Sequence, residues 1–506
     1  MVPVESVSNR KQRRWTLFAL PVLALSMLPI GMQPALAQTD SRMFTETGKT
    51  VSGKFLAYWD ANGGLAQQGL PISDEIQDVS NTDGKTYTMQ YFERAVFEAH
   101  PENQAPYDVL LSLLGTFQFS KLHPQGVPDA TASTDNAITF PETGMTVGGK
   151  FRAYWESHGG VAQQGFPISN EFQEKSPLDG KTYTVQYFER AVFEDHPENA
   201  APNDVLLSQL GTFEYQDRTS LSFTDWTGTT RTLPKRPTRI VCMTGFCEDA
   251  LFQLGLEPVA VSDKLYQQPY LWGPDKTFPA IGGGFGAPNL EDIAQQQPDL
   301  VIGFQNLIPQ REAIEKIAPL FIINPSKFED TIDNVRILAR LTGTLYQGEQ
   351  AIKHFYAKLN AYRAKSPNNK VPVLLFGNSV NFSIFTQSSM PGSILTAATY
   401  YPWPAEGGPL SPDQEPGSLQ YSLETLLDKD PDVILAITQG SGANGKLTDI
   451  LAANPIWSQL KAVKTGQVYE VSFSNFVTGR GLVSLGRALD DAMMKIYPET
   501  FTTPLP

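Results

Sequence analysis

The chain has 506 residues and a formal net charge of -14. This length exceeds one ordinary hydrophobic core, so two or more domains are expected. The acidic balance argues against a nucleic-acid partner, because phosphate backbones require clusters of Lys and Arg and none follows residue 14. Only two cysteines occur, so a disulfide framework or a Cys-rich metal module is excluded.

The N-terminus has the pattern of an export signal. Basic residues at positions 10–14 precede the apolar run WTLFALPVLALSMLPIG, and residues 35–37 then form an A-x-A cleavage site. We therefore predict a signal peptide over residues 1–37 and a mature chain that is secreted, periplasmic or held at the cell surface. An uncleaved membrane anchor is the alternative, and both Sec and twin-arginine export stay open.

A tandem duplication with a constant offset of 96 residues follows. FTETGKTVSGKFLAYWDANGGLAQQGLPISDE begins at Phe44 and recurs as FPETGMTVGGKFRAYWESHGGVAQQGFPISNE at Phe140. Two small β-rich modules are predicted, over residues 44–119 and 140–215, joined by the linker HPQGVPDATASTDNA. The strings G-x-P-x-S-x-E and YFERAVFE resemble repeats of bacterial surface proteins, including repeats proposed to hold the cell wall. That resemblance implies a spacer or a cell-wall contact.

From Arg231 onward, short apolar strands alternate with helices, which is typical of an α/β fold with mainly parallel sheets. The string NLEDIAQQQPDLVIG, at residue 289, matches SLETLLDKDPDVILA, at residue 422, in its cap residue, its Glu and its Pro-Asp step. These twins predict two similar lobes, over residues 232–345 and 370–498. Glu291 and Glu424 lie in the first turn of a helix, where ordinary capping by the helix dipole would account for both.

The part of the chain over residues 222–500 resembles the periplasmic-type substrate-binding proteins of ABC importers for ferric siderophores, haem and cobalamin. The resemblance rests on EDALFQLGLEPVAV, IGGGFGAPNLEDIAQQQPDLVIG, YSLETLLDKDPDVILA and GRGLVSLGRALDDAMMKIYPE. It implies two lobes joined by one long helix, for which residues 347–366 fit, since twenty residues span about 30 Å. It also implies that Glu291 and Glu424 dock against arginines of an ABC transporter permease.

The ligand of a two-lobed α/β protein lies at the carboxyl ends of the strands. The loops there offer many rings and few charges, which favours a ferric hydroxamate-like siderophore over a highly anionic catecholate complex. Haem or cobalamin binding by the same fold stays open, as does a cell-wall-associated structural protein. The candidate ligand contacts are Lys264, Tyr266, Tyr270, Trp272, Phe285, Phe304, Arg311, Asn381, Phe382, Trp403, Phe476 and Arg480.

The cleft loops contain no His, so we predict no protein-bound metal and no separate cofactor, with iron carried as a chelate in the ligand. No G-x-S-x-G elbow or H-E-x-x-H pair occurs, so the chain is predicted not to be an enzyme. Cys242 and Cys247 lie where the first strand meets the next helix. In an exported protein they form either a small-loop disulfide that braces the cleft or two buried thiols.

Overall fold

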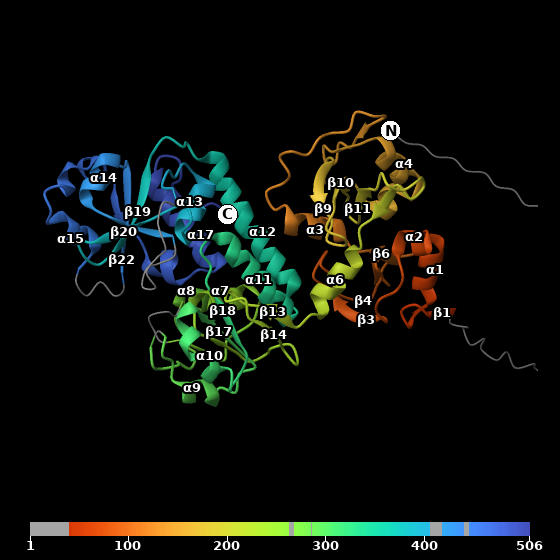
Figure 1. Ribbon diagram of the computed structural model, residues 1–506, viewed down its shortest axis with the longest axis horizontal. Coiled ribbons are helices and arrows are strands. Elements are labelled where there is room, and N and C mark those ends of the chain that lie inside the picture. Colours follow the sequence, from red (N-terminus) through yellow and green to blue (C-terminus); the bar gives the residue numbers. More distant parts are fainter. Residues whose placement is uncertain (1–39, 263–267, 285, 405–416, 440–444) are drawn as a thin grey trace, which may run out of the picture.

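The computed structural model describes residues 40–262, 268–284, 286–404, 417–439 and 445–506. The signal peptide predicted over residues 1–37 lies outside these residues. Figure 1 shows three bodies: a repeat unit on one side, a first lobe below the centre, and a second lobe on the far side. Among the described residues, no helix has both the length and the apolar character to cross a membrane.

Each repeat is built around a four-stranded antiparallel sheet, with strand orders β3-β4-β5-β6 and β12-β11-β10-β9. The string KTYTxQYFERAVFE forms the central hairpin of each sheet, as its alternation predicts. The first repeat contains β1 (Ser41–Phe44), β2 (Lys49–Ser52), α1 (Gly53–Ala61), α2 (Gly64–Gln68), β3 (Ile76–Val79), β4 (Thr86–Tyr91), β5 (Val96–Ala99), β6 (Val109–Leu111) and α3 (Leu114–Leu122). The second contains β7 (Ile138–Thr139), β8 (Thr146–Val147), α4 (Gly149–Ser157), α5 (Gly160–Gln164), β9 (Phe172–Lys175), β10 (Thr182–Tyr187), β11 (Val192–Asp195), β12 (Val205–Leu207) and α6 (Leu210–Thr219).

The two repeats exchange their last helices. At the start of α3, the backbone N–H of Thr116 donates to the carbonyl of Glu189 in the second repeat at 3.0 Å. The N–H of Thr212 in α6 donates in the same way to the carbonyl of Glu93 in the first repeat, also at 3.0 Å. Each helix therefore covers the sheet of the other repeat rather than its own.

One hydrophobic core runs through both repeats. A buried side-chain hydrogen bond from Gln164 Nε2 to Gln67 Oε1, 2.7 Å long, also joins them. The two predicted modules therefore pack together as one repeat unit through this shared core, and each also has a smaller core of its own. The shared core contains Tyr87, Met89, Tyr91, Val96, Leu114, Phe172, Tyr183, Val185, Tyr187, Val192 and Leu210.

The first lobe has a four-stranded parallel sheet in the order β16-β15-β17-β18, preceded by a hairpin of β13 and β14. Its strands are short and almost wholly buried, which is typical of a parallel sheet covered by helices. The elements are β13 (Ser222–Thr224), β14 (Thr230–Thr232), β15 (Ile240–Cys242), α7 (Gly245–Gln253), β16 (Ala260–Val261), α8 (Pro269–Trp272), α9 (Leu290–Gln295), β17 (Leu300–Phe304), a 3-10 helix (Gln305–Gln310), α10 (Arg311–Ile314), β18 (Leu320–Ile323) and α11 (Phe328–Thr342).

The second lobe has a five-stranded sheet in the order β21-β20-β19-β22-β23, in which β19, β22 and β23 are parallel. The predicted α/β fold with two lobes and mainly parallel sheets is therefore confirmed. The elements are β19 (Pro372–Gly377), β20 (Phe382–Phe385), α13 (Met390–Ala398), β21 (Ser418–Tyr421), α14 (Leu423–Lys429), β22 (Val433–Thr438), α15 (Leu447–Ala452), a 3-10 helix (Trp457–Gln459), α16 (Lys461–Lys464), β23 (Val468–Glu470), a π-helix (Ser474–Thr478) and α17 (Leu482–Ile496).

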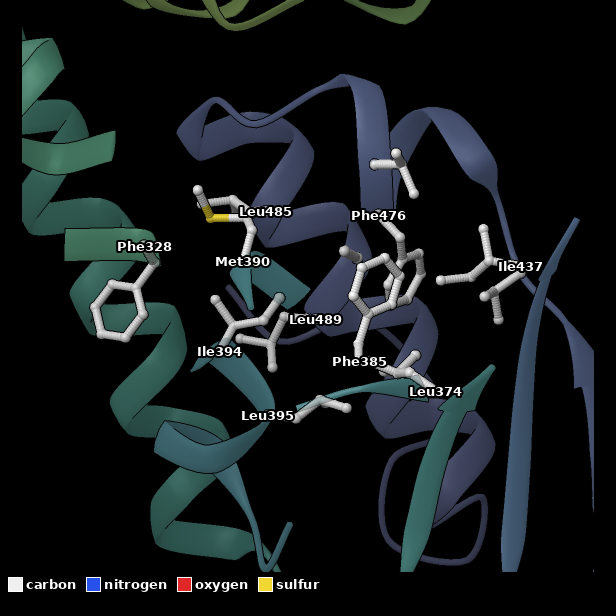
Figure 2. Packing of buried hydrophobic residues seen from close by; sticks show 14 of the residues in the cluster. Phe328, Leu374, Phe385, Met390, Ile394, Leu395, Ile437, Phe476, Leu485 and Leu489 are labelled. Atoms are coloured by element: carbon white, nitrogen blue, oxygen red, sulfur yellow. The ribbon is translucent and has the colours of Figure 1, made fainter. Parts of the chain in front are cut away.

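One helix of 21 residues, α12 (Leu345–Lys365), connects the lobes. Its ends differ by one or two residues from those predicted. It packs against α11, α13 and α17, and its apolar residues join the main core of the binding domain. Figure 2 shows part of this core, where Ile394 of α13 lies against Leu489 of α17. A single packed helix is a stiff connection, so wide hinge motion between the lobes is not expected.

The repeat unit is held against the first lobe by side chains of α11. Arg340 donates from its two terminal nitrogens to the carbonyls of Ser220, at 2.9 Å, and Ser222, at 2.7 Å. Arg336 donates to the carbonyl of Lys121 in α3 at 3.2 Å. Only two residues separate the end of α6 from the start of β13. The repeat unit and the binding domain are therefore joined by a short connection and by direct hydrogen bonds.

Candidate functional site

The first edge of the cleft is the turn between β15 and α7. A disulfide joins Cys242, the last residue of β15, to Cys247 in the first turn of α7, with their Cα atoms 5.3 Å apart. The hydroxyl of Thr244 caps the helix by accepting a hydrogen bond from the N–H of Cys247 at 3.2 Å. Both cysteines are fully buried. The disulfide and the helix cap thus both fix the turn at the carboxyl end of a central strand.

Arg480 connects the two lobes at the carboxyl ends of their sheets. Its guanidinium carbon lies 4.6 Å from the ring centroid of Phe304, the last residue of β17, and its Nη1 donates to the carbonyl of Pro325 at 3.3 Å. Its own backbone has a φ of +56°, in the left-handed region that non-glycine residues seldom occupy. Arg480 and Phe304 are therefore two predicted contacts that the structure brings together.

Two buried carboxyl groups lie beneath this edge, in α7, and the sequence analysis did not single them out. Asp249 accepts hydrogen bonds from the N–H groups of Val483, at 3.0 Å, and Ser484, at 2.8 Å, and so caps α17. Burial raises the pKa of Asp249. Burial also raises the pKa of Glu248 to about 7, with the nearby charge of Asp249 as a smaller cause. In the sequence, two adjacent acidic residues near the start of a predicted helix were the signal that could have indicated these buried carboxyl groups.

Three aromatic residues predicted to contact the ligand are core side chains in the structure. Phe382 and Phe476 are each 1% exposed, and Trp403 is 3% exposed. The indole N–H of Trp403 donates to the carbonyl of Pro372 at 2.6 Å, which accounts for its polar atom. Figure 2 shows Phe476 inside the core of the second lobe, near Phe385. These three rings pack in the core, because an aromatic ring near a strand end packs as readily as it binds, and their contact with the ligand stays a prediction.

The remaining predicted contacts are spread over both lobes. Arg311 forms an ion pair with Asp225, whose side chain is fully buried, so Arg311 holds the β13–β14 hairpin. Tyr270 lies under the guanidinium of Arg487, 4.5 Å from ring centroid to carbon. Trp272 packs edge-on against two phenylalanines of the same lobe, and Asn381 is exposed beside β20. The predicted contacts outside the described residues are Lys264, Tyr266 and Phe285.

The twin strings form the expected helix starts on the two lobes. Asn289 caps α9, its side chain accepting from the N–H of Glu291 at 3.0 Å, and Ser422 caps α14, its hydroxyl accepting from the N–H of Thr425 at 3.2 Å. Glu291 and Glu424 are both exposed in the first turn. Hydrogen bonding from its own backbone N–H lowers the pKa of Glu424, so this group stays ionised. Each lobe thus presents an exposed carboxylate in the first turn of the matching helix.

Comparison with known proteins identifies this part of the molecule. Residues 240–474 match the family described as periplasmic binding protein. These matched residues lie within the two-lobed domain. The match runs from β15 in the first lobe into the π-helix in the second, so it spans both sheets and the linking helix. The repeat unit lies outside the matched residues, and its resemblance to surface-protein repeats stays a prediction.

Individual relatives cover about half of this chain and most of their own length. The Fe(3+)-citrate-binding protein YfmC of Bacillus subtilis is 28% identical over 276 residues, 53% of this chain and 83% of the relative. The iron(3+)-hydroxamate-binding protein FhuD of Bacillus subtilis is 27% identical over 248 residues, 47% of this chain and 75% of the relative. The structure of the iron uptake binding protein PiuA of Streptococcus pneumoniae has a TM-score of 0.46 at 21% identity, and covers 55% of this chain and 99% of that one.

Proposed function

We propose that the protein is an exported binding protein that captures a ferric siderophore between its two lobes and delivers it to an ABC importer. The observation that carries the proposal is the family match over residues 240–474, which spans both lobes and the stiff helix between them. The family consists of substrate-binding proteins, so we expect no catalytic turnover. Arg480, which reaches from the second lobe to the first, is the cation we assign to the ligand.

A hydroxamate-like ferric siderophore is the favoured ligand. Two relatives, YfmC and FhuD, are named for binding ferric citrate and ferric hydroxamate, respectively. A highly anionic catecholate complex would require several cations, whereas Arg311 holds Asp225 and, of the predicted cationic contacts that the structure describes, Arg480 is the one that lies between the two sheets. Haem and cobalamin are the remaining alternatives for the same fold.

Fluorescence titration of the mature protein tests the proposal directly. The panel is ferric desferrioxamine, a ferric catecholate, ferric citrate, haem and cobalamin, with iron-free desferrioxamine as a control. We expect saturable quenching by the ferric hydroxamate, weakened about tenfold or more in Arg480→Ala because a charged contact is lost. Arg363→Ala, an exposed arginine of α12, serves as the matched control. Absence of binding across the panel would favour a cell-wall structural protein instead.

For delivery, we propose that Glu291 and Glu424 dock against arginines of the permease. The support is their matched position: each is an exposed, first-turn carboxylate on one lobe, next to a side-chain cap. Replacing both with Ala should leave ligand affinity unchanged, since exposed first-turn glutamates stabilise their helices by only about 0.3 to 1 kcal/mol. Uptake of the iron-loaded ligand by cells with the cognate permease should fall sharply. Normal uptake by the double variant would return both residues to a capping role.

For the repeat unit, we propose contact with the cell wall. The support is the resemblance of its G-x-P-x-S-x-E and YFERAVFE strings to surface-protein repeats. Sedimentation of the mature protein with purified cell walls measures the contact, and a matched protein that begins at Ser220 provides the comparison. If both sediment equally, the repeat unit does not mediate attachment.

A further inference from the structure

A cavity of about 340 Å³ lies between the repeat unit and the back of the binding domain. Its walls come from α3 and α6 on one side and from α11 and α12 on the other. The apolar part of the lining consists of Leu114, Phe117, Leu210, Ile337 and Leu345. A volume of this size at the contact between two domains, mostly apolar with a few polar groups, is typical of a small-molecule site. We call it the junction cavity.

The two repeats have diverged where they line the junction cavity. Leu114 and Leu210 are equivalent positions 96 residues apart, and they supply the same apolar surface from α3 and α6. One turn further along, Gln118 of α3 is matched by Glu214 of α6, and Lys121 is matched by Asp217. The second copy is therefore acidic where the first is neutral or basic. Both of these acidic side chains are paired, Glu214 with Arg218 and Asp217 with Lys121.

The cations that line the junction cavity have hydrogen-bond acceptors, whereas one of its carboxylates has no described donor. Each of its three cations has an acceptor: the Lys121 ammonium lies 2.5 Å from Asp217, Arg336 lies 2.8 Å from a carboxylate of α12, and Arg340 donates to two backbone carbonyls. Asp333 of α11, at the exposed rim, forms no hydrogen bond or ion pair with any residue that the structure describes. The charged group of the cavity that has no described partner is therefore a hydrogen-bond acceptor, the Asp333 carboxylate.

We propose that the junction cavity binds a small organic amine with an apolar body. A protonated amine has only donors, so it matches a lining whose cations already have acceptors and whose Asp333 carboxylate has no described donor. The amine pairs with Asp333 at the rim, and the apolar body lies against Phe117 and Ile337. Bound there, the ligand contacts both bodies at once and tightens their junction, because it binds only when the two are docked.

Isothermal titration of the mature protein with 2-phenylethylamine tests this site, and 3-phenylpropanoate, which has a carboxylate in place of the amine, is the control probe. We expect saturable binding of the amine alone. Asp333→Asn should weaken it about tenfold or more through loss of the charged hydrogen bond. Asp449→Asn, an exposed carboxylate on α15 without a described partner, should have no effect. Ile337→Trp, which fills the cavity, should abolish binding.

Three results of these titrations would overturn the proposal. Equal binding of the amine and the carboxylate, or unchanged affinity in Asp333→Asn, would overturn the proposal. So would a complete absence of heat for the amine with the correctly folded wild-type protein. The result is independent of the cleft between the lobes, because none of these residues lies at the carboxyl ends of the two sheets.

Discussion

Glu248 makes the stability of the binding domain depend on pH. The side chain is 1% exposed, its Oε2 accepts from the N–H of Gln268 at 3.3 Å, and its Oε1 has no partner among the described residues. Burial raises its pKa from 4.5 to about 7. The protonated form therefore stabilises the fold fully below pH 4.5, and this contribution is lost as the pH rises to 7. At about 1.36 kcal/mol per pKa unit, the loss is about 3 kcal/mol.

The variant Glu248→Gln keeps the shape of the side chain and removes the titration. Urea unfolding of both proteins should give similar free energies at pH 4.5. At pH 8 the variant should be more stable by up to about 3 kcal/mol, because only the wild-type protein must bury a charge. Comparison of the two proteins at each pH cancels the titration of all other groups, except for the coupling to Asp249. A difference that does not change with pH would refute the reasoning.

Two further predictions concern the repeat unit. Arg340→Ala removes two charged hydrogen bonds to backbone carbonyls, so we expect a loss of about 2 kcal/mol and faster hydrogen exchange at the junction, whereas Arg363→Ala on α12 should be neutral. Gly211→Ala should destabilise the repeat unit by several kcal/mol, measured by thermal unfolding, because a methyl group there collides with a carbonyl of the first repeat. The control Gly486→Ala should be tolerated, since the nearest atom to its added methyl group is at 3.5 Å. Equal effects within either pair would contradict the packing described.

The sequence was sufficient to predict the local elements of the repeats but not how they assemble. The YFERAVFE hairpins follow from their alternating pattern. The exchange of α3 and α6 does not, because two nearly identical repeats offer each helix two nearly identical sheets. Only the close approach of Gly115 and Gly211 to backbone of the other repeat distinguishes the arrangements, and that requires coordinates.

The same limit applies to the cleft. The apolar pattern predicted the strands, the family resemblance implied the long helix, and the spacing of the twins predicted two helix caps that the structure forms. The sequence pattern could not distinguish aromatic residues that line the ligand site from those that pack in the core. Phe304 lies under the guanidinium of Arg480, whereas Trp403 is buried in the core of the second lobe. Such residues are equally apolar, and whether one is exposed depends on which neighbours the tertiary structure supplies.

The fixed position of the repeat unit restricts where a permease can bind. The junction uses α11 and α12, so the back of the first lobe and part of the linking helix are covered. In Figure 1, α9 lies at the far end of the first lobe and α14 at the outer side of the second, both away from the repeat unit. Glu291 and Glu424 therefore stay accessible while the repeats are docked. The proposed attachment through the repeats and the proposed delivery through the lobes are therefore sterically compatible on one molecule.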